Sequence, residues 1–221
     1  LPFIYGWKWY PWARDFFEST NKLNFLCAAN QISKSSTQIR KCIHWATAPG
    51  MWNKLWSSAD NFEFGKPQFW YLYPSKDVAT LEFETKWKFL LPQGEMKDHP
   101  QYGWKEVYDN KKIAMIRFNT GLVLVFKTYG QEVMNLQSGT CDYIGCDEEV
   151  PDDIMGELFF RLAASTGYFS AVFTATIGQE YWRLAIEEKG KHEKFKGAAK
   201  WQISMYDCLL YEDGTPSSWT H

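Results

Sequence analysis

Short apolar runs alternate with segments of helical periodicity along this chain, and that alternation most constrains its fold. Apolar runs that indicate strands are Lys22–Ala29, Gln68–Pro74 and Ser170–Thr176. Segments with apolar residues at helical spacing follow them, at Ser35–Thr47, Ser75–Leu90 and Gly178–Glu188. Strands that are joined through helices run parallel, and a parallel sheet needs helices on both faces to bury it. The sequence therefore predicts an α/β fold with a central, mainly parallel sheet.

Other segments complete this outline. Lys112–Phe118 and Gly121–Thr128 flank an Asn-Thr-Gly turn and predict a hairpin. Cys141–Asp153 predicts a short strand that ends in acidic residues, and a helix follows at Asp153–Ser165. Pro92–Trp104 is predicted as an exposed loop. Near the C-terminus, Glu187–Lys200 is predicted as a solvated linker and Trp201–Glu212 as a final strand.

The segment Cys27–Ser36, CAANQISKSS, has the layout of a phosphate-binding loop without its glycines. A Walker A loop has Gly, four free positions, Gly, Lys, then Ser or Thr. Here Ala28 and Ser33 take the glycine positions, while Lys34 and Ser35 fit. If Ser33 takes a left-handed conformation, it carries a strain of about 1–2 kcal/mol. The alternative interpretation is an ordinary helix cap. The residues expected around a bound phosphate chain are Asn30, Gln31, Ile32, Ser33, Lys34, Ser35 and Ser36.

Chemistry-bearing residues follow three predicted strands, where ligands of parallel sheets bind. They are Lys34 and Ser35, then Asp147 and Glu148, then Thr174 and Thr176. A nucleoside triphosphate needs a cation for its phosphates, a hydroxyl and a carboxylate for Mg²⁺, and a base for the attacking water. Lys34, Ser35, Asp147 and Glu148 supply these in chain order. The acidic run alone is also typical of a solvated turn, but the combination favours a site for a nucleoside triphosphate and Mg²⁺.

Composition excludes several other classes. The formal net charge of −2 gives no overall basic footprint for nucleic acid, so any such contact must come from a local patch. Five cysteines in a chain of this size fit a reducing compartment, and neither they nor the four histidines have metal-site spacing. No apolar run approaches the roughly 20 residues of a membrane span. We therefore expect a soluble protein with no membrane partner, and its 12 tryptophans in a core or contact surface.

Four segments together resemble the ATPase motor domain of the large terminase subunit of tailed bacteriophages: AANQISKSS, FWYLYPSKDVATLEFETKWKFLLP, LQSGTCDYIGCDEEVP and FTATIG. The resemblance implies a P-loop NTPase fold of the ASCE/RecA-like type. It also implies ATP-driven translocation of double-stranded DNA into a procapsid, in the cytoplasm of the infected bacterial host. The expected partners are the DNA, the portal protein, the small terminase subunit and further copies of the chain in a ring.

The resemblance also assigns roles to residues. Lys34 contacts the phosphates, Ser35 and Asp147 the magnesium, and Glu148 the hydrolytic water, while Thr174 and Thr176 match the motif that couples hydrolysis to movement. Asn30 stands where family members often have an arginine. Upstream, YPWARDFF resembles the adenine-binding segment, with Ala13 where glutamine is frequent; Tyr10, Trp12 and Arg14 are candidates to hold the base. Their alternative role is the packing of an N-terminal segment.

A packaging ring also needs an arginine from a neighbouring subunit. Arg161 is the first candidate for this role and Arg183 the second. The alternative interpretation of Arg161 is a surface arginine on an amphipathic helix. We expect residues 1–190 to be the ATPase domain and residues 191–221 a linker or lid that leads towards a nuclease domain. That domain has no room in the chain, so we expect no nuclease activity. Two other functions stay open: a helicase-like nucleic-acid motor, and a non-catalytic P-loop interaction module.

Overall fold

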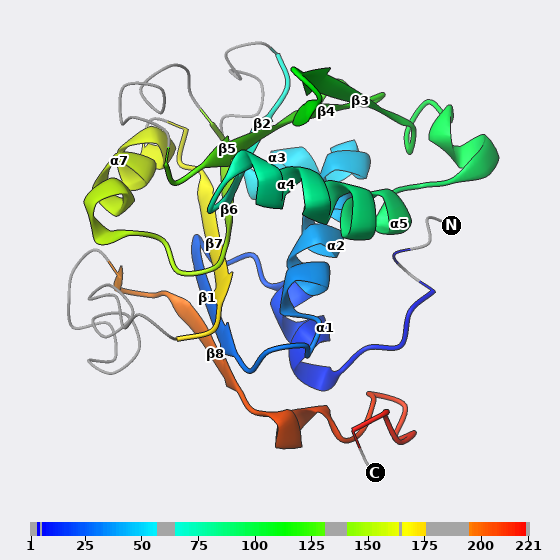
Figure 1. The fold of residues 1–221 in the computed structure, drawn as a ribbon, viewed down its shortest axis with the longest axis vertical. Coiled ribbons are helices and arrows are strands. Elements are labelled where there is room, and N and C mark those ends of the chain that lie inside the picture. The colour runs from blue at the N-terminus through cyan, green and yellow to red at the C-terminus, as the bar shows by residue number, and fades with distance from the viewer. Residues whose placement is uncertain are drawn as a thin grey trace.

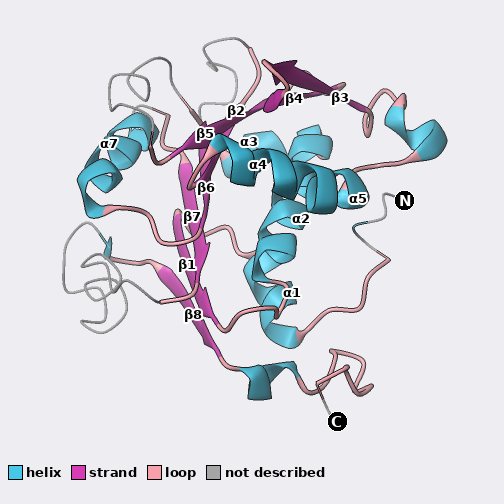
Figure 2. Cartoon of the chain, in the orientation of Figure 1, coloured by secondary structure: helices cyan, strands magenta, loops and turns pink. Residues whose placement is uncertain are grey.

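The computed structural model describes residues 4, 6–56, 65–130, 141–163, 165–175 and 195–219. These residues form one sheet with helices on both faces (Figure 1 and Figure 2). The strands are β1 Leu23–Ala28, β2 Gln68–Tyr73, β3 Trp104–Asp109, β4 Lys112–Phe118, β5 Val123–Thr128, β6 Tyr143–Asp147, β7 Tyr168–Phe173 and β8 Ala199–Ile203. The α-helices are α1 Pro11–Glu18, α2 Lys34–Thr47, α3 Trp52–Leu55, α4 Lys76–Glu82, α5 Lys88–Leu90 and α7 Asp152–Ala163. Shorter helical turns are η2 Pro49–Met51, η4 Phe83–Trp87, η5 Gly94–Lys97 and η8 Met205–Cys208.

The sheet has eight strands in the order β3-β4-β5-β2-β6-β7-β1-β8. The strands from β5 to β8 in this order run parallel, whereas β4 is antiparallel to β5 and β3 is antiparallel to β4. The predicted α/β fold with a mainly parallel sheet is therefore confirmed, and the predicted hairpin is the β4–β5 pair. Strand β3 was not predicted, because it lies at the sheet edge and becomes exposed along its length, so its sequence has no apolar period.

Helices cover the two faces of the sheet unequally. In Figure 1, α7 lies on one side and α1 to α5 lie on the other. Because both faces are covered, β6 and β7 are buried along their whole length, which explains their almost continuous apolar sequences. Trp45, Trp56 and Trp87 are fully buried on the α2 side, where Trp45 and Trp56 pack edge to face with ring centroids 5.9 Å apart. Part of the high tryptophan content thus builds the core.

The helix predicted at Ser75–Leu90 begins after Ser75, whose hydroxyl accepts a hydrogen bond from the Val78 amide at 3.3 Å. It is not a continuous α-helix, because the π-helical turn η4 separates α4 from α5. The predicted loop after it contains only the short turn η5 before β3 begins.

The C-terminal segment differs in part from its prediction. The last strand is β8, which begins two residues before the predicted start and ends at Ile203. It pairs in parallel with β1, so residues beyond the expected boundary at 190 belong to the same sheet. The helix expected at Gly178–Glu188 lies outside the described residues, as does most of the expected linker. Within the described ranges, no helix is both long and apolar enough to span a membrane.

Candidate nucleotide site

The loop between β1 and α2 makes the turn that glycines usually make, without containing any. Gln31 and Ser33 have φ angles of 64° and 69°, in the left-handed region that favours glycine. Ser33 therefore takes the left-handed conformation for which the sequence analysis gave a strain of about 1–2 kcal/mol. Ser33 precedes α2 directly, and its side chain makes no capping hydrogen bond, while its carbonyl accepts from the Thr37 amide at 2.9 Å. The loop thus leads the chain into the positive end of a helix of 14 residues.

Lys34 connects this loop to the end of β7. Its Nζ donates to Thr174 Oγ1 at 2.9 Å and to Asn30 Oδ1 at 3.4 Å. Thr174 Oγ1 in turn lies 2.8 Å from Asn30 Oδ1. Lys34 is buried, so these contacts hold its ammonium group at the carboxyl ends of β1 and β7. The strand-end prediction brought Lys34 and Thr174 together correctly, while Thr176 lies outside the described residues.

Ser35 connects the loop to the end of β6. Its hydroxyl donates to Asp147 Oδ1 at 3.0 Å, and Tyr71 Oη donates to Asp147 Oδ2 at 3.4 Å. Burial raises the pKa of the Asp147 carboxyl to about 7, against the opposing effects of the Lys86 ammonium and the Ser35 hydroxyl. A buried carboxylate with so little positive charge beside it favours the approach of a cation. Ser35 and Asp147 therefore have the chemistry and the position to hold Mg²⁺.

Glu148 follows Asp147 and turns the chain away from the sheet. It has a φ of 73°, and its amide donates to the Val172 carbonyl at 2.9 Å. Tyr129 Oη donates to the Asp147 carbonyl at 2.7 Å, which fixes the backbone at this point. The Glu148 side chain is exposed and lines a cavity of about 470 Å³. The cavity is bounded by Asn30, Gln31, Ser33, Lys34, Ser35, Ser36, Lys86 and Glu148.

Most of the predicted phosphate-binding residues therefore surround one cavity. Ile32 is the exception, since its side chain is fully buried in the core beneath the loop. Glu149, next to the predicted base, is also buried. Lys86, which comes from the π turn η4, was not among the predicted residues. No group of three or more histidine, cysteine, aspartate or glutamate side chains gathers as a metal site within the described part of the chain.

A second cavity of about 200 Å³ adjoins the first, and Ser33 and Ser36 line both. Its other walls come from two ends of the chain and from α2: Trp7, Lys8, Trp9, Tyr10, Ala13, Thr37, Arg40 and Tyr211. The rings of Tyr10 and Tyr211 stack with centroids 5.0 Å apart, and Arg40 lies over the Trp9 ring at 3.3 Å. Aromatic faces beside a cation suit a nucleobase.

Of the three residues that were candidates to hold the base, only Tyr10 lines this second cavity. Trp12 is buried in the core, and Arg14 forms ion pairs with Glu18 and Glu212 at 3.5 and 3.4 Å. Arg40 was missed, although it follows Ser36 and Thr37 by four and three residues and so shares their face of α2.

Arg161 lies away from both cavities. It is on α7 and pairs with Glu157, whose carboxylate accepts from Arg161 Nε at 2.7 Å. Arg161 interacts electrostatically with Cys141, which precedes β6 at the end opposite to Asp147. Arg161 is therefore not part of this chain's own nucleotide site, and its role across an interface stays a prediction. Arg183 lies outside the described residues.

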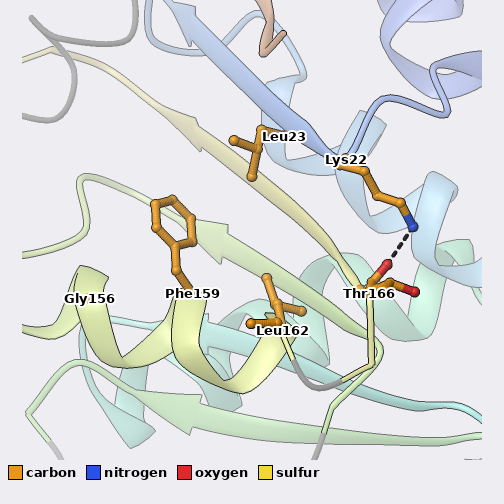
Figure 3. Close-up of a pocket in the computed structure, with 8 residues that line it drawn as sticks. Lys22, Leu23, Gly156, Phe159, Leu162 and Thr166 are labelled. Atoms are coloured by element: carbon orange, nitrogen blue, oxygen red, sulfur yellow. Dashed lines mark hydrogen bonds between the residues drawn. The ribbon is translucent and has the colours of Figure 1, made fainter. Parts of the chain in front are cut away.

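A third cavity of about 490 Å³ lies at the amino ends of the strands, between β1 and α7 (Figure 3). Leu23, Phe159 and Leu162 point towards it, and Lys22 Nζ donates to the Thr166 carbonyl at its rim. It contains no carboxylate or second cation among its described lining residues. Most of the predicted phosphate-binding residues line the cavity at the other ends of the strands.

Known structures share this fold, although no family model matches the chain and no curated protein matches its sequence. The large terminase ATPase domain of Thermus phage P74-26 gives a TM-score of 0.61 at 13% identity, over 92% of this chain and 84% of that one. The large terminase of a thermophilic bacteriophage gives 0.63 at 13% identity, over 94% of this chain and 49% of that one.

A second structure of the latter large terminase, in complex with ADP, gives a TM-score of 0.60 at 13% identity, over 90% of this chain and 46% of that one. The chain thus spans about half the length of that terminase. At such identities the comparison establishes the fold alone. This is the fold of terminase ATPase domains, as the resemblance of the sequence implied.

Proposed function

We propose that this chain, which has the fold of phage large terminase ATPase domains, hydrolyses ATP with Mg²⁺ and drives double-stranded DNA into a procapsid. The observation that carries the ATPase proposal is the hydrogen bond of 3.0 Å between Ser35 Oγ and Asp147 Oδ1. It joins the first turn of α2 to the end of β6, and both Lys34 and Glu148 line the adjoining cavity. These are the hydroxyl, carboxylate, cation and base that phosphoryl transfer to water requires.

Ser35 and Asp147 are the residues that would hold the magnesium ion that accompanies ATP. Mg²⁺ prefers oxygen ligands and is commonly held by one or two protein groups together with substrate phosphates and water. When bound, it neutralises phosphate charge and orients the terminal phosphoryl group. The buried Asp147 carboxylate and the Ser35 hydroxyl fit this ion better than they fit zinc, which prefers histidine and cysteine.

Glu148 is the proposed base. Its carboxylate accepts a proton from water as the water oxygen bonds to the γ-phosphorus, and the bond from that phosphorus to the β–γ bridging oxygen breaks. The products are ADP and inorganic phosphate. Lys34 and the amide groups at the start of α2 bind the phosphate oxygens and stabilise their charge. The adjoining cavity at Tyr10, Arg40 and Tyr211 receives the nucleobase.

The motor function rests on the fold and on the resemblance of the sequence. We infer that copies of the chain act in a ring with the portal protein and the small terminase subunit, in the cytoplasm of the infected host. Thr174, which contacts Lys34 at 2.9 Å, is placed to sense the phosphates and pass their presence to the chain after β7. Arg161 is the proposed cation supplied to a neighbouring copy.

Calorimetry and phosphate release test the ATPase proposal on the 221-residue chain. Lys34→Ala should weaken ATP binding by about tenfold or more, because the lysine meets the phosphates before the reaction begins. Glu148→Gln should retain binding and lower hydrolysis by about 10²- to 10⁴-fold, since only the base is lost. Lys112→Ala removes the same charge from an exposed pair with Asp77 and should change neither.

Three results would contradict the assignment. Unchanged ATP affinity in Lys34→Ala would show that the loop is not a Walker A loop. Undiminished turnover in Glu148→Gln would place the base elsewhere. No binding of Mg-ATP by the unaltered chain at millimolar concentration would favour the non-catalytic interaction module.

A further inference from the structure

Lys86 is a second cation in the phosphate cavity, and it comes from a different layer of the fold than Lys34. It lies in η4, the π-helical turn between α4 and α5. Such turns widen a helix by one residue and occur frequently at functional sites. Among the described residues that line the cavity, Lys34 and Lys86 are the two cations, and Glu148 is the carboxylate. Lys86 therefore faces the same space as the proposed base.

The contacts of the two lysines differ. Lys34 is buried and fixed by Thr174 and Asn30, whereas the Lys86 side chain is 37% exposed. Lys86 Nζ forms an ion pair with Glu82, one helical turn earlier, at 2.6 Å. The pair is partly exposed, 37% for the lysine and 20% for the glutamate, so water screens it at the lysine end and reduces the free energy that it contributes. Lys86 is thus available to a more strongly charged partner that enters the cavity.

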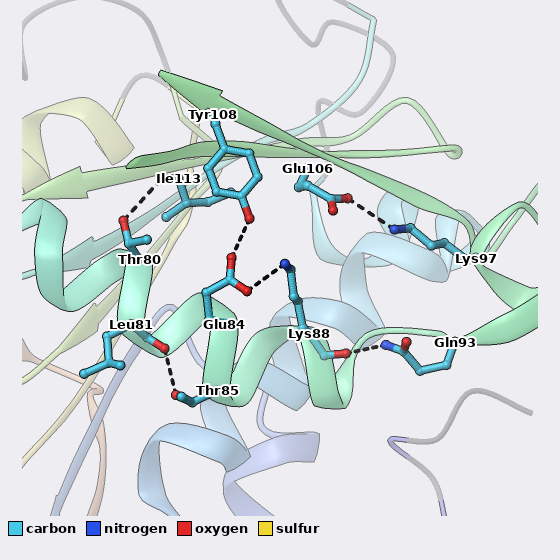
Figure 4. Close-up of polar contacts among 10 residues, drawn as sticks. All are labelled: Thr80, Leu81, Glu84, Thr85, Lys88, Gln93, Lys97, Glu106, Tyr108 and Ile113. Carbon is cyan, nitrogen blue, oxygen red and sulfur yellow. Dashed lines mark hydrogen bonds and ion pairs between the residues drawn. The ribbon is translucent and has the colours of Figure 1, made fainter. Parts of the chain in front are cut away.

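The opposite side of the same helix is anchored to the sheet (Figure 4). Glu84 accepts from Tyr108 Oη at 2.6 Å and pairs with Lys88 at 2.7 Å, while the Ile113 amide donates to Thr80 Oγ1 at 3.2 Å. Trp87, next to Lys86, is fully buried, and its Nε1 donates to Tyr73 Oη at 3.0 Å. The backbone of η4 is held in place, so the Lys86 side chain starts from a fixed point at the cavity.

We propose that Lys86 exchanges Glu82 for the γ-phosphate when ATP binds, and stabilises the charge on the γ-phosphate oxygens during hydrolysis. This inference rests on the proposed ATPase function and adds a residue to it. A phosphoryl group in transfer spreads negative charge over three oxygens, more than one lysine can contact. ADP lacks that group, so Lys86 contributes to the affinity for ATP and much less to the affinity for ADP.

The test compares Lys86→Ala with Lys88→Ala on the 221-residue chain. Lys88 is its matched control, because it lies two residues away on the same helix, forms an ion pair of the same type with Glu84, and does not line the cavity. Calorimetry with Mg-ATP and Mg-ADP gives both affinities, and phosphate release gives kcat. Melting temperatures of all variants establish that each one folds.

We expect Lys86→Ala to lower ATP affinity by about tenfold and ADP affinity by less than about threefold, as for loss of one charge-assisted contact at a partly exposed site. Its kcat should fall by about tenfold or more. Lys86→Arg should restore most of both, and Lys88→Ala should stay within about twofold of the unaltered chain.

Equal losses for ATP and ADP, or no change in either affinity and in kcat, would overturn the inference while leaving the ATPase function intact. An unaltered chain that binds no ATP would overturn both. Lys88→Ala with the same ATP-selective loss as Lys86→Ala would also overturn it, because the effect would then come from the general charge of the helix.

Discussion

Ser33→Gly tests whether the nucleotide loop holds its turn at an energetic cost. Ser33 has φ 69° and ψ 21°, a conformation that costs an L-residue about 1–2 kcal/mol and costs glycine almost nothing. Glycine loses roughly 0.5–1 kcal/mol more conformational entropy on folding. The Ser33 carbonyl keeps its hydrogen bond from the Thr37 amide in either case, and the Ser33 side chain caps nothing. The expected net result is a stabilisation of about 0.5–1 kcal/mol.

Urea unfolding measures that stability, and calorimetry with Mg-ATP measures the effect on binding. Ser33 lines both adjoining cavities, so removing its side chain opens the wall where a triphosphate passes from one to the other. We expect ATP affinity to be preserved or to rise modestly in Ser33→Gly. Ser33→Val should lose both stability and affinity, because a β-branched residue is strongly disfavoured in the left-handed region.

Ser33→Ala separates the strain from the hydroxyl, since it keeps the Cβ and removes only the oxygen. If glycine proves less stable than alanine here, the strain argument is wrong. A similar large loss of ATP affinity in Ser33→Ala and Ser33→Gly would make the hydroxyl a ligand. Full ATP affinity in Ser33→Val would show that this loop does not wrap phosphate.

Two further predictions concern residues outside the cavities. Arg161→Ala should leave the ATP affinity of the isolated chain unchanged and abolish hydrolysis that assembly with portal and procapsid stimulates. Mixing it with Glu148→Gln should restore part of that activity, and no restoration at saturating assembly would count against Arg161. Lys41 is fully buried, and burial lowers its pKa to about 7, so between about pH 7 and 10.5 the folded state holds fewer protons than the unfolded state. The free energy of unfolding should therefore rise with pH by up to about 1.4 kcal/mol per pH unit in this range. Denaturation between pH 7.5 and 8.5 should show this rise in the unaltered chain and not in Lys41→Met. An equal dependence of the unfolding free energy on pH in both proteins would refute the assignment.

The sheet and the first contacts of the site could be predicted because they follow from chain order. Parallel strands bring their carboxyl ends to one edge, so Lys34, Asp147 and Thr174 were expected together before any contact was known. Lys86 could not be found in this way, since its position depends on a π turn that shifts the helix register by one residue. Arg40 and Tyr211 were missed for another reason, because their cavity is built from α2 and both ends of the chain.

The resemblance of the N-terminal segment predicted where the second cavity lies, but not which residues line it. It selected Tyr10, Trp12 and Arg14 as a group, yet on α1 and the residue before it the three side chains point in different directions. Tyr10 therefore lines the cavity, Trp12 enters the core, and Arg14 pairs with Glu18 and Glu212. Sequence similarity alone does not specify which face of a short helix meets a ligand.

The position of β1 between β7 and β8 has a consequence for how the chain is made. Asn24 pairs with Ser170 on one side and with Ala199 on the other, both far along the sequence. During synthesis the chain emerges from its N-terminus, so β1 leaves the ribosome long before either neighbour exists. Until then the apolar segment from Leu23 to Ala28 lacks its strand partners, so it can bind chaperones or aggregate. Lys34, at the start of α2, can make its contact with Thr174 only after β7 has been translated.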